Sequence, residues 1–251
     1  MTAGRSQLLG VVNIHPVPSA RFTKLGVFAT IVVVLAGSAA QLINYEFFGL
    51  SVRALDPGSD GGLFGVIHGI ALAAAAVSAW VLAARVRSAR TAAAVLAALL
   101  TFLTADDVAR LHDNIPDWPA FYLPVLAASF ICLVAVSRGP SGRRAERGAG
   151  RAVDRLIGAG LLLLTLSFLL HVLGPRLLVD LGMGDYTGFA YQAKATVKHA
   201  TEIAGWFLVA LGLESCGSDL QCAHCTRCCV VPVSPSNASA DVSTPARINA
   251  N

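Results

Sequence analysis

Six apolar segments, each about twenty residues long, restrict what this chain can fold into. They lie near residues 23–44, 62–84, 91–111, 119–138, 154–174 and 188–213. A helix of about 20 residues crosses the hydrocarbon core of a bilayer, which is roughly 30 Å thick. Only 14% of the residues are charged, whereas a soluble domain has about 25%. The segments therefore predict an all-α, polytopic transmembrane bundle of six helices.

The sequence on either side of these segments defines three predicted regions. Residues 1–21 form a cytoplasmic N-terminal segment, residues 22–214 the six-helix transmembrane domain, and residues 215–251 a cytoplasmic tail. The tail begins with a Cys-rich stretch and continues as a polar, Pro- and Ser-rich sequence without periodicity, which predicts disorder. The first apolar segment is too long for the apolar part of a cleavable signal peptide, so we expect it to be a retained span.

Lys and Arg are distributed unevenly between the loops. Twelve of them lie before the first segment, between the second and third, or between the fourth and fifth: Arg5, Arg21, Lys24, Arg85, Arg87, Arg90, Arg138, Arg143, Arg144, Arg147, Arg151 and Arg155. The opposite loops hold Arg53, Arg110 and Arg176. Because basic loops stay in the cytoplasm, this bias predicts a multi-pass protein of the bacterial inner membrane with both termini inside. The same rule explains the net charge of +4, so the expected partner is the lipid bilayer and not nucleic acid.

With this orientation, the ionisable residues of the segments fall in the outward-facing half. The sixth segment is polar on one face as far as Glu202 and apolar all round after it. Glu202 lies roughly 17 Å from the cytoplasmic end, near the bilayer midplane, where a lipid-facing carboxylate costs several kcal/mol. We therefore expect a polar cavity open to the outside, lined by the third and sixth helices. Its candidate ligand-binding residues are Asp106, Asp107, His112, Lys198, His199 and Glu202.

A divalent metal site is one interpretation of these residues. His and carboxylate side chains suit a metal such as Zn, although the sequence does not identify a cofactor. The candidate metal ligands are His68, Asp107, His171, His199 and Glu202. The last two, three residues apart, can chelate one ion from a single helix face. Against this, Lys194 and Lys198 share that face and repel a cation. In addition, Asp107 and His112 lie roughly 140° apart on an ideal helix, so they chelate together only if the helix end unwinds.

Three further interpretations remain open. In a structural network, Lys198 and Glu202, four residues apart, neutralise each other and set the helix register without chemistry. In a proton relay or transporter, the same residues receive protons from Asp107, although six spans without inverted repeats favour transport only in a homo-oligomer. In a metal-dependent hydrolase of lipid-like substrates, His199 or the metal activates water. Binding of an unidentified small ligand or ion is the first choice, hydrolysis the second and a structural or partner-binding role the third.

The Cys-rich stretch is a separate candidate site. Four thiolates for zinc are provided by Cys216, Cys222, Cys225 and Cys228, and the reducing cytosol keeps them available. Their spacing also resembles the start of a bacterial ferredoxin cluster motif, but Pro232 stands where that motif requires its fourth Cys. A tail of reactive thiols without a metal is the simpler interpretation.

Two motifs carry a resemblance to a known family. They are LTADDVARLHDNIPDW at positions 103–118 and YQAKATVKHATEIAGWFLVALGL at positions 191–213. The chain resembles a family of bacterial six-helix membrane proteins that have an acidic pair, a His and a further acid at the end of the third helix. These proteins also have closely spaced acids in the last helix, followed by an apolar run that contains Gly.

The two motifs match this family to different extents. The match to the first motif consists of Asp106, Asp107, His112 and Asp113. In the second motif Glu202 matches, while His199 stands where a further acid is expected. Over most of positions 22–213 the resemblance implies the fold and the membrane location, but no activity. A looser similarity exists to membrane hydrolases that bind zinc at the ends of a helix bundle, such as alkaline ceramidases. Those have seven spans and paired His in the last helix, which this chain lacks.

Overall fold

The described part of the chain is almost entirely helical. The computed structural model describes residues 20–56, 62–87, 90–115, 118–138, 149–185 and 187–229. Within these residues the chain forms seven α-helices and no strand, which confirms the all-α prediction. The helices are α1 (Ala20–Phe48), α2 (Leu63–Arg85), α3 (Arg90–Ala109), α4 (Trp118–Arg138), α5 (Ala149–Val172), α6 (Gly174–Asp180) and α7 (Phe189–Cys229).

Five of the described helices, α1 to α5, are long and apolar enough to cross a membrane. On α1, the large apolar side chains that are at least half exposed are Phe22, Leu25, Phe28, Ile31, Leu35, Leu42, Phe47 and Phe48. Such a surface is unfavourable in water, whereas in a bilayer it faces the acyl chains. The chain is therefore a multi-pass membrane protein. α7 is not among the five, because polar residues flank its apolar stretch from Ile203 to Leu213.

The end of the chain differs from its prediction in two places. The sequence predicts that the last helix ends at 213, but α7 continues to Cys229. The loss of apolar residues after Leu213 therefore marks a change of surroundings and not the end of the helix. The fifth predicted segment ends at residue 174, and the next residue, Pro175, lies in the first turn of a further helix, α6, where a helix needs no backbone N–H. The predicted disordered part of the tail, 230–251, lies outside the described residues.

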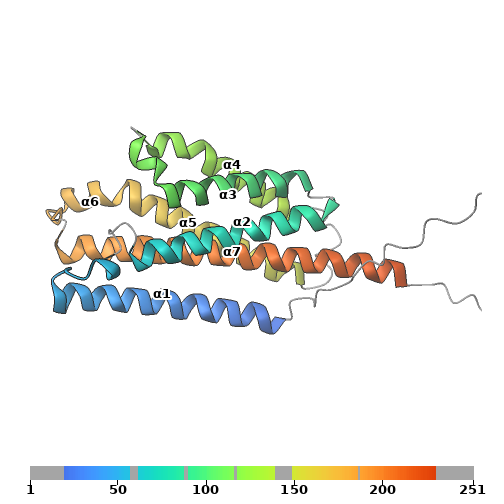
Figure 1. Cartoon of the computed structure of the whole chain (residues 1–251), viewed down its shortest axis with the longest axis horizontal. Coiled ribbons are helices and arrows are strands. Elements are labelled where there is room, and N and C mark those ends of the chain that lie inside the picture. The colour runs from blue at the N-terminus through green and yellow to red at the C-terminus, as the bar shows by residue number, and fades with distance from the viewer. Residues whose placement is uncertain are drawn as a thin grey trace, which may run out of the picture.

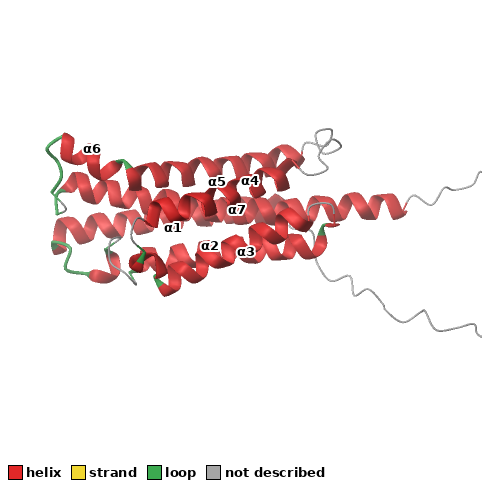
Figure 2. Ribbon diagram, turned by 90° about the horizontal axis from the view of Figure 1, so that it is seen from above, coloured by secondary structure: helices red, strands yellow, loops and turns green. Residues whose placement is uncertain are grey.

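α7 is the central helix of the bundle (Figure 1). It packs against α1, α2 and α5, while α3 packs against α2 and α4. Seen from above, α2 and α3 lie on one side of α7 and α5 and α6 on the other (Figure 2). Because α4 contacts both α3 and α5, the five helices α2, α3, α4, α5 and α7 form a closed ring. α1 packs on the outer side of α7.

α5 and α7 approach each other closely where two glycines meet. A Cβ added to Gly160 would lie 2.8 Å from the carbonyl oxygen of Gly205, and one added to Gly205 would lie 3.0 Å from that of Gly160. Small residues at such crossings are typical of membrane helices, which associate by van der Waals packing rather than by the hydrophobic effect. This contact comes directly after Glu202 in the chain, so it positions the polar half of α7 against α5.

Candidate functional site

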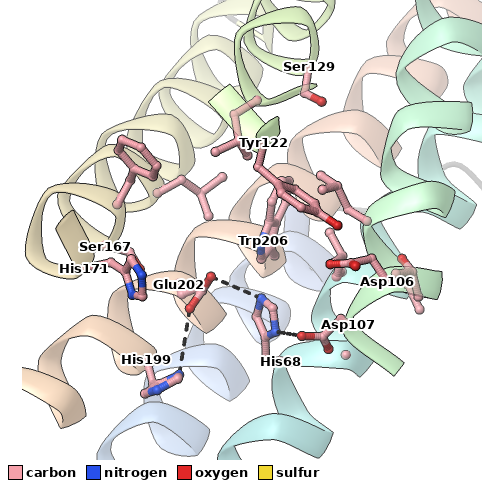
Figure 3. Close-up of a pocket in the computed structure, with 18 of the residues that line it drawn as sticks. His68, Asp106, Asp107, Tyr122, Ser129, Ser167, His171, His199, Glu202 and Trp206 are labelled. Carbon is pink, nitrogen blue, oxygen red and sulfur yellow. Dashed lines mark hydrogen bonds and ion pairs between the residues drawn. The ribbon is translucent and has the colours of Figure 1, made fainter. Parts of the chain in front are cut away.

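The ring of five helices surrounds a cavity of about 940 Å³. This volume lies at the upper end of the range for ligand-binding cavities, roughly 300–1,000 Å³. Most of the side chains that line it are apolar. Figure 3 shows the polar ones pointing toward one another from different helices. The cavity therefore combines an apolar wall with one polar region.

His68 of α2 lies at the centre of that polar region (Figure 3). Its Nδ1 is 3.0 Å from Oδ1 of Asp107 on α3, and its Nε2 is 3.5 Å from Oε1 of Glu202 on α7. The first contact is a hydrogen bond, while the second is too long for a good one. Within the described structure, the buried Nε2 atom has no hydrogen-bond partner. One imidazole thus connects three helices and lies between two carboxylates.

Glu202 also contacts polar side chains of its own helix. Its Oε2 lies 3.2 Å from Nζ of Lys198 and 3.8 Å from Nδ1 of His199. The contact with Lys198 is the ion pair that their spacing of four residues predicts. The three side chains are between 20 and 23% exposed, so Glu202 is neutralised inside the protein instead of facing lipid. On α2, the ring of Phe64 packs against His199, with centroids 6.1 Å apart.

Asp107 approaches α2 closely because Gly69 leaves room for it. A Cβ added to Gly69 would lie 3.2 Å from Oδ2 of Asp107. Three residues after Asp107, Arg110 has a φ of 53°, a left-handed conformation that ends a helix. The chain then enters a short 3₁₀ helix, Leu111–Asn114. The helix end therefore unwinds, as joint binding by Asp107 and His112 requires, but the side chain of His112 lies outside the described residues.

Asp106 has a different partner from its neighbour Asp107. Its side chain is buried, and the hydroxyl group of Tyr122 on α4 points toward its carboxyl group (Figure 3). The ring of Tyr122 stacks on that of Phe102, with centroids 6.1 Å apart. Sequence reasoning missed Tyr122, because a Tyr near the end of a membrane helix is usually an interface anchor. One feature of the sequence points to Tyr122: it lies one turn into a helix that has no charged residue before Arg138.

Most of the predicted site residues meet in this cavity. Those that line it are His68, Asp106, Asp107, His171, Lys198, His199 and Glu202. Within the described residues, no group of three or more His, Cys, Asp or Glu is close enough to hold a metal ion. The ammonium group of Lys198 lies beside Glu202, where it repels a cation, as its position in the sequence predicts. In the conformation described, these residues form a network of ion pairs and hydrogen bonds.

The cysteines of the predicted tail site lie on α7. Cys216 is buried, and the side chains of Cys222, Cys225 and Cys228 lie outside the described ones. At 1.5 Å per residue, Cys216 and Cys228 are roughly 18 Å apart along the helix axis, whereas zinc–sulfur bonds are about 2.3 Å long. A continuous helix therefore cannot bring all four thiolates to one metal ion.

A second polar contact joins α1 to α7 outside the cavity. Nε2 of Gln41 donates to Oε1 of Gln192 at 3.0 Å, and Gln41 is buried. Near the end of α1, the side chain of Asn44 accepts from the backbone N–H of Val52 and donates to its carbonyl oxygen, both at 3.1 Å. These residues attach α1 and the loop after it to the bundle, and they do not line the cavity.

The cavity lies within a segment that matches a known family. The family is described as a domain of unknown function, DUF8692, and it matches residues 25–216. The match includes every residue that lines the cavity and excludes most of the Cys-rich stretch. No curated protein and no solved structure matches the chain. The chain therefore belongs to the DUF8692 family.

Proposed function

We propose that this protein crosses the bacterial inner membrane six times, with α7 as the sixth span. The position of α7 supports this, because α1, α2 and α5 surround it. Its ionisable residues Lys198, His199 and Glu202 line the cavity, so lipid does not have to solvate them. The start of α1 and the end of α7 lie at the same end of the bundle (Figure 1), as an even number of crossings requires.

The proposed orientation has both termini in the cytoplasm. Basic residues support it, since they gather at the end of the bundle where α1 starts, α2 ends and α7 ends (Figure 1). Those in the described residues are Arg21, Lys24, Arg85, Arg87, Arg90, Arg138, Arg151, Arg155 and Arg227. The positive-inside rule assigns this end to the cytoplasm. His68, near the start of α2, and Asp107, near the end of α3, then lie toward the outer surface.

We further propose that the cavity binds a small ligand at His68 and Glu202. The observation that carries this proposal is the environment of His68: the residue lines the cavity, and its buried Nε2 atom lacks a hydrogen-bond partner in the described structure. Buried polar atoms are nearly always hydrogen-bonded. Since Asp107 already orients the ring through Nδ1, a ligand placed between His68 and Glu202 supplies the missing partner.

Native mass spectrometry of the full chain in a mild detergent tests ligand binding. We expect a small molecule to co-purify with the wild-type protein and to be lost from His68→Ala. Thr201→Val is the matched control, because Thr201 is adjacent to Glu202 but donates to the carbonyl oxygen of Val197 at 2.9 Å and does not line the cavity. If the wild type carries nothing, and a membrane extract of the expressing cells does not raise its melting temperature, ligand binding is wrong.

A metal-dependent hydrolase of lipid-like substrates is the second candidate. The Asp107–His68 contact favours it, because a carboxylate commonly orients a metal-binding His through one ring nitrogen and leaves the other for the metal. Elemental analysis of protein purified without chelator is the test. Zinc bound to the wild type and lost from His68→Ala supports the hydrolase, while equal metal contents in the two proteins remove it. If both this test and ligand binding fail, a structural or partner-binding role remains.

A further inference from the structure

The lining of the cavity changes from polar to apolar in the same direction on all five helices. Toward the end that is proposed to face outward, one polar residue comes from each helix: His68, Asp107, Tyr122, His171 and Lys198. Deeper in the bundle, the corresponding residues are Leu72, Leu103, Leu133, Leu161 and Trp206. Because α3 and α5 run in the opposite direction to α2, α4 and α7, this agreement is a property of the cavity and not of any single helix.

The hydroxyl groups in the deeper part do not make it polar. Thr104 donates to the carbonyl oxygen of Leu100 at 2.7 Å, and Ser129 donates to that of Val125 at 2.8 Å. Both hydroxyl groups are thus satisfied within their own helices, as is common in membrane spans. The inner part of the cavity therefore offers a ligand mainly apolar contacts.

The cavity is long, and it is open at the side. His171 and Leu161 both line it on α5, which gives a depth of roughly 15 Å at 1.5 Å per residue. On α4, the lining residues Leu123 and Phe130 are 54% and 47% exposed. These side chains belong to a helix that is apolar enough to span a membrane. The surroundings of this opening are therefore lipid, so a ligand can enter from the bilayer.

From this geometry we propose that the ligand is a single-chain amphiphile taken from the bilayer, with a hydroxyl or ammonium head; this rests on the ligand binding proposed above. The alkyl chain lies between α4, α5 and α7, and the head donates hydrogen bonds near His68 and Glu202. A small water-soluble ligand at the polar end would leave the apolar part unfilled, and protein interiors rarely leave such space.

The charges that line the cavity determine the nature of the head. Three carboxyl groups, those of Asp106, Asp107 and Glu202, line the cavity together with two cationic side chains, those of Lys198 and Arg110, so the carboxyl groups outnumber the cations by one. A hydroxyl or ammonium head supplies hydrogen-bond donors to these carboxylates. An anionic head is repelled, because like charges in a poorly solvated site are strongly unfavourable.

Photolabelling of the full chain in nanodiscs tests this proposal. The probes are dodecyl chains that carry a diazirine on the chain and an ammonium, hydroxyl or carboxylate head. We expect the ammonium and hydroxyl probes to label residues of the deep cavity, and the carboxylate probe to label them about tenfold less, a difference well within what a charged contact produces. Unlabelled dodecylamine should block the labelling, and ethylamine at the same concentration should not.

Two variants locate the labelling. Leu133→Trp fills the apolar part, since Leu133 is buried in its wall, and it should abolish the labelling. Leu162→Trp is the control, because Leu162 is 70% exposed on α5 and does not line the cavity; labelling should persist. If Leu133→Trp does not fold, the competition between dodecylamine and ethylamine on the wild-type protein still tests whether the ligand is an amphiphile.

The possible failures are distinguishable. If ethylamine blocks labelling as well as dodecylamine does, or if the co-purified molecule is water-soluble, the amphiphile is wrong and ligand binding stands. Equal labelling by the carboxylate probe overturns the assignment of the head. If all the probes label only lipid-facing residues, the amphiphile is likewise wrong. If the protein in addition carries no co-purified molecule, ligand binding itself fails.

Discussion

The part of α7 up to Glu202, its first half, and the part from Ile203 onward, its second half, contact the same neighbours, α2 and α5, in different ways. In the first half, Lys198, His199 and Glu202 line a cavity that lies between the helices. In the second half, glycines bring the helices into contact. A Cβ added to Gly212 would lie 2.6 Å from Cγ1 of Ile157 on α5, and the contact between Gly160 and Gly205 is as close. The first half thus keeps its neighbours apart, and the second half holds them together.

This difference indicates how a membrane bundle keeps a cavity open. Side chains around a cavity lose van der Waals contacts, and in a bilayer the hydrophobic effect does not replace them, because lipid is as apolar as the protein interior. The close packing of the second half has to compensate. We therefore expect changes in the second half to affect mainly stability, and changes in the first half to affect mainly binding.

The largest expected effect is that of Gly160→Ala on α5, which packs against the second half of α7. The new methyl group meets backbone atoms of α7, which cannot rotate away, so we expect a loss of about 1–3 kcal/mol in the free energy of unfolding. Gly158→Ala is the control, because a Cβ there meets nothing within 4 Å; it should be neutral or stabilising by up to about 1 kcal/mol. Unfolding in detergent, followed by circular dichroism, measures both. Equal stability of the two variants would contradict the role assigned to the second half.

A smaller effect is expected for the ion pair of the first half. A double-mutant cycle with Lys198→Met and Glu202→Gln should give a coupling energy of roughly 0.5–3 kcal/mol, because each single change leaves a partly buried group without its partner. The control cycle uses Lys194→Met, since Lys194 lies 4.3 Å from the ring centroid of Tyr191 and has no ion pair with Glu202 in the described structure; its coupling should stay below about 0.5 kcal/mol. Similar coupling energies in both cycles would mean that the ion pair between Lys198 and Glu202 makes no contribution of its own to stability.

The smallest change in stability is expected for Gly69→Ala, which separates binding from folding. Alanine favours a helix over glycine by about 1 kcal/mol, but here the methyl group pushes on Asp107, so the two effects should nearly cancel. Ligand retention, measured by native mass spectrometry, should fall because His68 loses its orienting partner. Gly158→Ala, whose Cβ meets nothing within 4 Å and which does not line the cavity, should gain stability and keep the ligand. Retention in both variants would show that Asp107 does not position His68.

The parts of the fold that depend on local properties of the sequence were predictable. Five apolar segments correspond to α1–α5, with ends within a few residues of those predicted, because hydropathy and helix rise are local properties. α7 was harder to delimit. Its helix does not end where its apolar residues end, since Cys216 is buried against the bundle and supports a further stretch of helix. The amino-acid composition of a helix indicates what surrounds it, but it does not indicate where the helix ends.

For the candidate site, the sequence predicted which half of the bundle holds the polar residues, but not which side chains contact one another. Positions along the helices assign His68, Asp107 and Glu202 to the same half of the bundle, and these residues do meet. The sequence does not indicate that His68 is the link between the two carboxylates. It also assigns no role to α4, whose Tyr122 and Phe130 line the cavity, because aromatic and apolar residues on a span are equally suited to lipid.

The sequence by itself determined that α1–α5 are long and apolar enough to enter a membrane and that His68, Asp107 and Glu202 lie in the same half of the bundle. Both follow from hydropathy and from a rise of about 1.5 Å per residue. Only the tertiary structure decided that α7 is the central helix and that His68 faces Asp107 and Glu202. These features depend on the order of the helices around the bundle and on the rotation of each about its axis. Hydropathy does not specify either one, because lipid and the packed interior are equally apolar environments.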